Sequence, residues 1–279
     1  MESVFAIKFS KVCINGCEIR YAYIGDNRKP VLLLLHGFTG DKLVWSRILK
    51  TLSKNFFVIA PDLIGHGDSG DPLKQDYRIA SHVVYIHKFC LFLNIHSAHV
   101  SGCSMGAFIA LELANSHPYF VRSLSLINPV GINKLQMEQL SNFRVRPVNP
   151  FIVSSAGEYD VLLDYMMAKP CYIPDMVKSY LASRHIKRSA LIEKMFSHLM
   201  NSKTIEEYLV LDLPPTMVLL CDKDRVADMS ISLNFFKKQK SAVIVISDHN
   251  GHLPMLESPK FLCKQLISFY TKIENNHQE

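Results

Sequence analysis

The chain has 279 residues, of which 48% are hydrophobic and 20% are charged, proportions typical of a folded globular protein. Its formal net charge is +6, but no run of Lys or Arg is long enough to indicate a nucleic-acid-binding tail, so we expect no nucleic-acid partner. The longest apolar run, residues 31–35, is too short to cross a bilayer, so we expect no transmembrane segment.

The cysteines and the first ten residues indicate where in the cell the protein is located. The seven cysteines are an odd number and lie mostly in apolar runs, which favours free thiols that serve as small hydrophobic side chains in a reducing environment. Residues 1–10 show no basic segment followed by an apolar stretch and a small-residue cleavage site. Both features predict a cytoplasmic location.

The first half of the chain alternates strands with helices. Two strands are expected over residues 4–9 and 18–24, joined by a turn at Asn15-Gly16, a dipeptide that favours hairpins. The continuous apolar run 31–35 predicts a parallel strand that is buried on both faces. Further strands are expected over residues 56–60, 98–103 and 121–127, and helices over residues 44–53, 79–93 and 105–116.

The alternation stops after residue 130. No stretch from 131 to 207 has the pattern of a buried strand, and Ser155 and Glu158 have the spacing of a capping box that begins a helix. We interpret residues 131–207 as a helical lid, a separate unit that excludes water from a site beneath it. Residues 1–130 and 208–279 are then expected to form the core.

The core pattern resumes with strands over residues 217–221 and 242–246 and with helices over residues 230–238 and 254–271. Alternation of this kind predicts a mostly parallel α/β sheet with helices on both faces. Ligand chemistry in such sheets lies at the carboxyl ends of the strands, where we expect the functional residues.

The sequence Gly102-Cys103-Ser104-Met105-Gly106 lies between an expected strand and an expected helix. A serine hydroxyl at such a sharp turn is exposed for nucleophilic attack, and the crowded backbone favours glycine two residues before and after it. Ser104 is therefore the predicted nucleophile.

A serine nucleophile needs an acid to orient its base, and the loop after the strand 217–221 holds Asp222 and Asp224. We favour Asp224, because Asp222 follows the strand too closely to reach across. Asp228 is expected to cap the next helix instead. Asn128, at a position where some enzymes of this architecture place their acid, carries no negative charge.

The base is expected in the loop after the strand 242–246, which holds His249 and His252. We favour His252, because it precedes the last helix and follows Gly251, which lets the loop turn. His249 is expected to be a surface residue.

Two backbone N–H groups are needed to bind the oxyanion that forms during attack. Met105, at the start of the helix after Ser104, is expected to supply one. Phe38 is expected to supply the other, since Gly37 lets the chain bend over the nucleophile.

The remaining histidines indicate no metal site. His36 is expected to be a structural loop residue, and His82 and His87 are five residues apart, on different faces of a helix. We expect no metal and no cofactor.

With these residues placed, the chain resembles the α/β-hydrolase superfamily over nearly its whole length. The motifs that carry the resemblance are residues 36–38, 62–69, 102–106, 222–224 and 251–254. The resemblance implies an α/β-hydrolase fold with a catalytic triad of Ser104, Asp224 and His252 and with oxyanion donors at Phe38 and Met105. Serine at the nucleophile position argues against the dehalogenase and epoxide-hydrolase branches.

Residues 36–42, 149–153 and 169–174 resemble the bacterial lipases and monoacylglycerol lipases of this superfamily. This resemblance implies a serine esterase, of the carboxylesterase or lipase type, that hydrolyses small-molecule acyl esters through an acyl-serine intermediate.

Three alternatives stay open. The basic residues of the expected lid could dock an acidic acyl-carrier protein, as in the pimeloyl-carrier methyl ester esterases of biotin synthesis. Hydrolases of C–C bonds share the triad, and a ligand-binding protein could keep the scaffold without catalysis, although such proteins usually lose a triad member. The basic residues in question are Lys178, Arg184, Lys187, Arg188 and Lys194.

Overall fold

The computed structural model describes all residues except 1–5, 73, 143–148, 150, 209–211 and 277–279. Eight strands form one sheet in the order β1-β2-β4-β3-β5-β6-β7-β8, and only the β1–β2 and β2–β4 pairs are antiparallel. The strands are β1 (Lys8–Ile14), β2 (Cys17–Ile24), β3 (Val31–Leu35), β4 (Phe57–Pro61), β5 (Ala98–Cys103), β6 (Val121–Ile127), β7 (Thr216–Cys221) and β8 (Ala242–Ser247). The mostly parallel α/β sheet is as expected from the sequence.

The first strand lies later in the chain than the sequence pattern suggested. The expected strand 4–9 begins outside the described residues, and β1 starts at Lys8 and continues to Ile14. The turn itself was predicted correctly, since Asn15 and Gly16 have φ angles of 49° and 75°. This two-residue turn pairs Ile14 directly with Cys17. The bounds of β1 are therefore set by its pairing with β2, and not by the apolar residues that precede β1 in the sequence.

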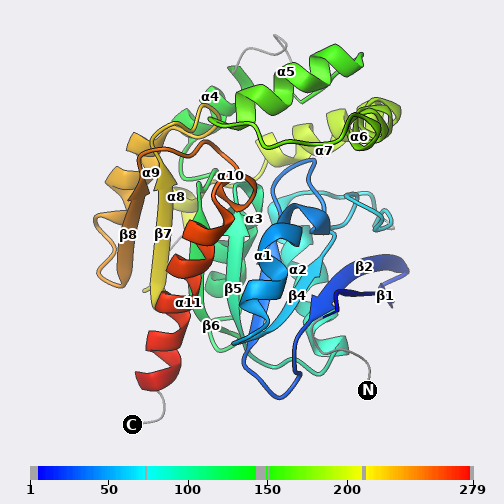
Figure 1. The fold of residues 1–279 in the computed structure, drawn as a ribbon. Helices are drawn as coiled ribbons and strands as arrows, with labels where there is room; N and C mark the ends of the chain where they lie inside the picture. Colours follow the sequence, from blue (N-terminus) through cyan, green and yellow to red (C-terminus); the bar gives the residue numbers. More distant parts are fainter. Residues whose placement is uncertain (1–5, 73, 143–148, 150, 209–211, 277–279) are drawn as a thin grey trace.

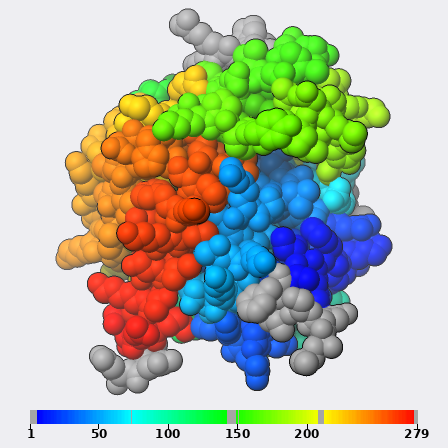
Figure 2. Space-filling view, in the orientation of Figure 1, coloured from blue at the N-terminus to red at the C-terminus, as the bar shows by residue number. Residues whose placement is uncertain are grey.

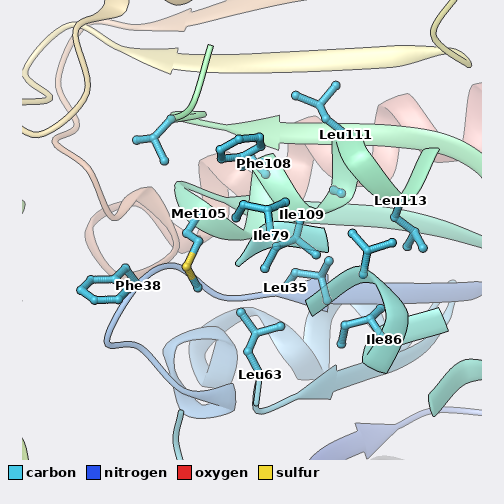
Figure 3. Close-up of a cluster of buried hydrophobic side chains, with 14 of the residues drawn as sticks. Leu35, Phe38, Leu63, Ile79, Ile86, Met105, Phe108, Ile109, Leu111 and Leu113 are labelled. Carbon is cyan, nitrogen blue, oxygen red and sulfur yellow. The ribbon is translucent and has the colours of Figure 1, made fainter. Parts of the chain in front are cut away.

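Helices cover both faces of the sheet (Figure 1). Leu32 and Leu34 of β3 pack in a cluster with η1, α1 and α11, whereas Leu33 and Leu35 belong to the cluster that includes α2 and α3. Figure 3 shows part of this second cluster. The core helices are η1 (Lys42–Trp45), α1 (Ser46–Leu52), α2 (Ile79–Phe92), α3 (Met105–Ser116), α9 (Met229–Phe236), α10 (Pro254–Glu257) and α11 (Pro259–Asn276).

The single helix expected over residues 254–271 is two helices. Ser258 interrupts it with φ −138° and ψ 62°. Pro259 explains the break, because a proline disfavours the helical conformation of the residue before it and donates no hydrogen bond. The second helix, α11, extends to Asn276, and its buried face includes Leu266 and Tyr270.

A helical insertion separates β6 from β7 in the chain. Its helices are α4 (Lys134–Asn142), α5 (Ala156–Met166), α6 (Asp175–Lys187), α7 (Ser189–Met200) and α8 (Ile205–Tyr208). The Ser155 side chain caps α5 by accepting a hydrogen bond from Glu158 N. In Figure 1, α5, α6 and α7 lie across one end of the sheet, and in Figure 2 the green part of the chain covers the same end of the molecule. None of the helices in the described part of the chain is both long and apolar enough to cross a membrane.

Candidate active site

Ser104 lies at a strained turn between β5 and α3. Its φ of 55° and ψ of −121° are unfavourable for a residue with a side chain, and its N–H donates to Ile127 O over 2.9 Å. The flanking glycines have no room for a side chain. A Cβ on Gly102 would lie 2.2 Å from Gly106 O, and one on Gly106 would lie 2.1 Å from Leu35 O. Close packing therefore requires the glycine spacing around Ser104.

The structure brings Asp224 and His252 together. Asp224 Oδ2 lies 2.7 Å from His252 Nδ1, and the two side chains are 1% and 2% exposed. The other carboxylate oxygen accepts hydrogen bonds from the N–H groups of Val226 and Ala227, at 2.8 and 3.0 Å. An aspartate that accepts from Nδ1–H leaves Nε2 free to accept a proton, which is the state a general base needs.

The loop that carries His252 lies beside the Ser104 turn. Cys103 Sγ, in the residue before Ser104, is 3.7 Å from His252 O. The structure contains no hydrogen bond between the Ser104 hydroxyl and the His252 ring. Catalytic hydrogen bonds often tighten only when substrate is bound, so this geometry is compatible with a serine–histidine pair.

Asn128 holds this loop to the end of β7, a role that the sequence did not indicate. Its side-chain nitrogen donates to Gly251 O and His252 O, at 3.2 and 3.1 Å, and its oxygen accepts from Cys221 N at 2.9 Å. Asn128 is buried, so these bonds satisfy polar groups that water does not reach.

The acids and the histidine that were not favoured as triad members have other partners than the favoured residues. Asp222 forms an ion pair with the lysine that follows it. His249 is bonded to the preceding aspartate, and its side chain is 43% exposed. Asp228 caps α9 by accepting from Ser230 N over 2.8 Å.

The predicted oxyanion donors are the N–H groups of Phe38 and Met105. Met105 is the first residue of α3, where N–H groups have no partner within the helix. Phe38 follows Gly37, at which a Cβ would lie 3.2 Å from Ser104 Cβ. Within the part of the chain that the structure describes, neither N–H donates to another protein group, so both can donate to a bound oxygen.

A buried ion pair fixes the loop that carries Phe38. Lys42 Nζ lies 2.7 Å from carboxylate oxygens of both Asp62 and Asp68, and Lys42 N donates to the other Asp62 oxygen. Burial acts to lower the pKa of Lys42, but the hydrogen bonds to Asp62 and Asp68 outweigh it and raise that pKa above its usual value. Lys42 and Asp62 are twenty residues apart, so sequence spacing gave no sign of this pair.

Three buried histidines lie near this loop. The rings of His36 and His66 are 5.4 Å apart, and those of His66 and His82 are 5.8 Å apart. His36 has the structural role expected of it, since its Nε2 accepts from Leu63 N at 3.0 Å. Burial lowers the pKa of all three histidines. Among the described residues, no three His, Cys, Asp or Glu side chains are arranged to hold a metal ion.

A cavity of about 60 Å³ lies between the helical insertion and the loops after β3 and β4. Leu181, Ile192 and Met195 contribute apolar surface to it, and Ser104 does not line it. The ring of Phe38 contacts Phe151 and Phe196 of the insertion, with centroids 5.0 and 5.8 Å apart. The insertion thus packs on the residue that is predicted to bind the oxyanion.

Comparison with known proteins agrees with this architecture. The family model described as "alpha/beta hydrolase fold" matches residues 30–259. Lipase 1 of Psychrobacter immobilis is 30% identical over 252 residues, 88% of this chain and 78% of that protein. The monoacylglycerol lipase ABHD6 of Mus musculus is 27% identical over 286 residues, 93% of this chain and 84% of that protein.

Among solved structures, a membrane phospholipase A, described as a novel bacterial virulence factor, superposes with a TM-score of 0.91. It is 30% identical, and the match covers 98% of this chain and 88% of that one. The chain therefore belongs to the α/β-hydrolase fold family.

Proposed function

We propose that the protein is a lipase-type carboxylic-ester hydrolase in which Ser104 is the nucleophile, His252 the base and Asp224 the acid. The observation that carries this proposal is the buried hydrogen bond between Asp224 and His252 on a loop next to the strained Ser104 turn. The names of the relatives, lipases and a monoacylglycerol lipase, favour acyl esters as the substrate class.

The mechanism follows from the positions of these groups. His252 Nε2 takes the proton from Ser104 Oγ as that oxygen attacks the ester carbonyl carbon. The carbonyl oxygen becomes an oxyanion, which the N–H groups of Phe38 and Met105 stabilise. His252 then passes its proton to the leaving alcohol as the C–O bond breaks. Water, deprotonated by His252, attacks the acyl group on Ser104 and releases the acid.

The helical insertion, residues 131–207, acts as a lid on a core made of residues 1–130 and 208–279. Arg188 donates to Gly65 O and Gly67 O, and Arg184 donates to Asp68 over 2.8 Å. These bonds hold α6 and α7 against the loop after β4, over the cavity. A lid in this place excludes water and shapes the acyl-binding site.

The contacts of four of the five basic residues argue against an acyl-carrier protein as partner. Arg184 and Arg188 face the core, Lys178 pairs with Asp160, and Lys194 bonds to a glutamine side chain. A surface that docks an acidic protein needs charges that are free to meet it. A free small-molecule ester therefore fits the lid better than a carrier-bound one. The free cysteines, most of them buried, support a cytoplasmic location.

Hydrolysis of a series of nitrophenyl esters with acyl chains of increasing length tests this function. The native protein should hydrolyse the esters and should be labelled by a fluorophosphonate, whereas Ser104→Ala should lose about 10⁶-fold in turnover and all labelling. Ser116→Ala, on the exposed end of α3, should behave as the native protein. Ester hydrolysis at the native rate by Ser104→Ala would reject the serine mechanism, and absence of both activities in the native protein would favour a non-catalytic binding protein.

A further inference from the structure

Glu257, the last residue of α10, bridges two segments that lie far apart in the sequence. Its carboxylate accepts from Gly251 N, at 3.0 Å to each oxygen. The same group accepts from Ala168 N at 2.8 Å and from Lys169 N at 3.0 Å. One partly buried carboxylate thus binds three main-chain N–H groups, one next to His252 and two at the end of α5 in the insertion.

Direct contacts join the same two segments. His252 N donates to Met166 O over 2.8 Å. Gly251 packs so closely on the insertion that a Cβ would lie 2.5 Å from Ala168 N. The end of α5 and the loop of His252 are therefore packed as one unit, with the Glu257 carboxylate between their N–H groups.

We infer that Glu257 is a positioning residue that fixes His252 by joining its loop to the helical insertion; this rests on the proposed function. Hydrogen bonds to an ionised carboxylate are stronger than those between neutral groups. Glu257 holds the His252 loop on the side of the insertion, and Asn128 holds it on the side of the sheet. Displacement of a catalytic group by about 1 Å can lower a rate about 100-fold.

Glu257→Gln tests this role, because it keeps the size of the side chain but removes the charge and one acceptor oxygen. We expect kcat, per active site titrated with fluorophosphonate, to fall about 10- to 100-fold. KM for a short soluble ester should change little, because the Glu257 carboxylate is bonded to main-chain N–H groups and is not predicted to touch substrate. A variant that only folds less well would contain fewer active sites with an unchanged kcat at each.

The double variant with His252→Ala separates positioning from general destabilisation. If Glu257 acts through His252, adding Glu257→Gln to His252→Ala should not lower the residual rate further. Glu207→Gln is the matched control, since Glu207 also accepts a main-chain N–H, that of Thr204 at 2.7 Å, near the other end of the insertion. It should lower the melting temperature without changing kcat per site.

The inference is overturned if Glu257→Gln keeps the native kcat per site or lowers the rate equally in the His252→Ala background. If Glu257→Gln does not fold, Glu257→Asp, which keeps the charge on a shorter side chain, should fold and show a smaller loss of kcat; a native kcat there would also overturn it. Failure of the proposed function would be seen separately, as absence of ester hydrolysis by the native protein.

Discussion

The side chain of Asn128 donates a hydrogen bond to the main-chain oxygen of His252 over 3.1 Å. Asn128 follows β6 and has a φ of 43°, a conformation that asparagine adopts more readily than most residues. Its amide is both donor and acceptor, which the site requires, since two carbonyl oxygens and one N–H group surround it. A carboxylate at this position could accept from Cys221 but could not donate to the loop of His252.

Asn128→Asp is therefore expected to be harmful, although it places an acid where some related enzymes carry theirs. It would leave the oxygens of Gly251 and His252 facing a carboxylate, and the free energy of unfolding should fall by about 1–3 kcal/mol. Urea denaturation measures the loss of stability, and kcat measures the effect on catalysis. Asn94→Asp is the control, because Asn94 also has a positive φ, of 58°, but is exposed. Native stability in Asn128→Asp would contradict the assigned hydrogen bonds.

Asp224→Asn and Asp222→Asn distinguish the two candidate acids. In Asp224→Asn the side chain can no longer hold the Nδ1–H tautomer of His252, so kcat should fall by about 10⁴-fold. Asp222→Asn removes a surface charge and should leave kcat close to the native value. Steady-state hydrolysis of one soluble ester by both variants is sufficient, and the opposite ranking would assign the role to Asp222.

Arg188→Gln should weaken the attachment of the insertion. The guanidinium group donates to two main-chain oxygens, at Gly65 and Gly67, and a glutamine cannot reach both. We expect the free energy of unfolding to fall by about 1–3 kcal/mol, as for loss of charged hydrogen bonds. Lys187→Gln, at the neighbouring exposed position, controls for loss of charge. Equal stabilities of the two variants in urea would show that the Arg188 contacts contribute nothing.

The buried histidines predict lower stability in acid. Burial lowers the pKa of His82 from 6.5 to about 3, so between these values the unfolded chain binds a proton that the folded chain does not. The free energy of unfolding should therefore decrease as the pH falls from about 6.5, by at most about 1.4 kcal/mol per pH unit for this one histidine.

His82→Gln checks this prediction, because glutamine does not titrate. Unfolding free energies at several pH values from 4 to 6.5 should show a slope reduced by up to one proton, with His36 and His66 still contributing. Replacement of the exposed His96 by Gln is the control for loss of a histidine at the surface. An unchanged slope in His82→Gln would mean that this ring takes up its proton equally in the folded and unfolded chains.

Local patterns were sufficient to predict most of the fold. The apolar run of β3, the Asn15-Gly16 turn and the glycines around Ser104 each reflect a requirement that neighbouring residues satisfy. The choice of Asp224 over Asp222 also depended on spacing within one loop, and only Asp224 is bonded to His252.

Contacts between distant residues could not be predicted in this way. Glu257 meets Ala168, 89 positions earlier, and Asn128 meets His252, 124 positions later. Neither residue has a local pattern that marks it, since an ordinary glutamate near a proline and an asparagine after a strand occur in many loops. These contacts can be identified only in the folded structure, in which the order of the strands brings the partner residues together.

The basic residues of the insertion illustrate the same limit. A count of charges cannot tell which face of a helix meets the core, and Arg184 and Arg188 face inward because carboxylate and carbonyl oxygens of the opposite loop accept from them. The break at Ser258, by contrast, has a local cause in Pro259 that the sequence interpretation overlooked.

The insertion leaves the sheet from β6 and returns to it at β7, and these two strands are adjacent, with Ile127 paired to Leu219. The two ends of the insertion lie side by side, because Ile205 N donates to Gly131 O over 2.8 Å and Glu206 N donates to Ile132 O over 3.0 Å. A segment of another length or sequence can therefore be grafted there without shifting the register of any strand. Such an exchange would retain Ser104, the proposed nucleophile, and its loop while changing which ester fits the proposed acyl-binding site. Any grafted segment must still place main-chain N–H groups where they can donate to Glu257. This carboxylate therefore limits which segments can replace the insertion.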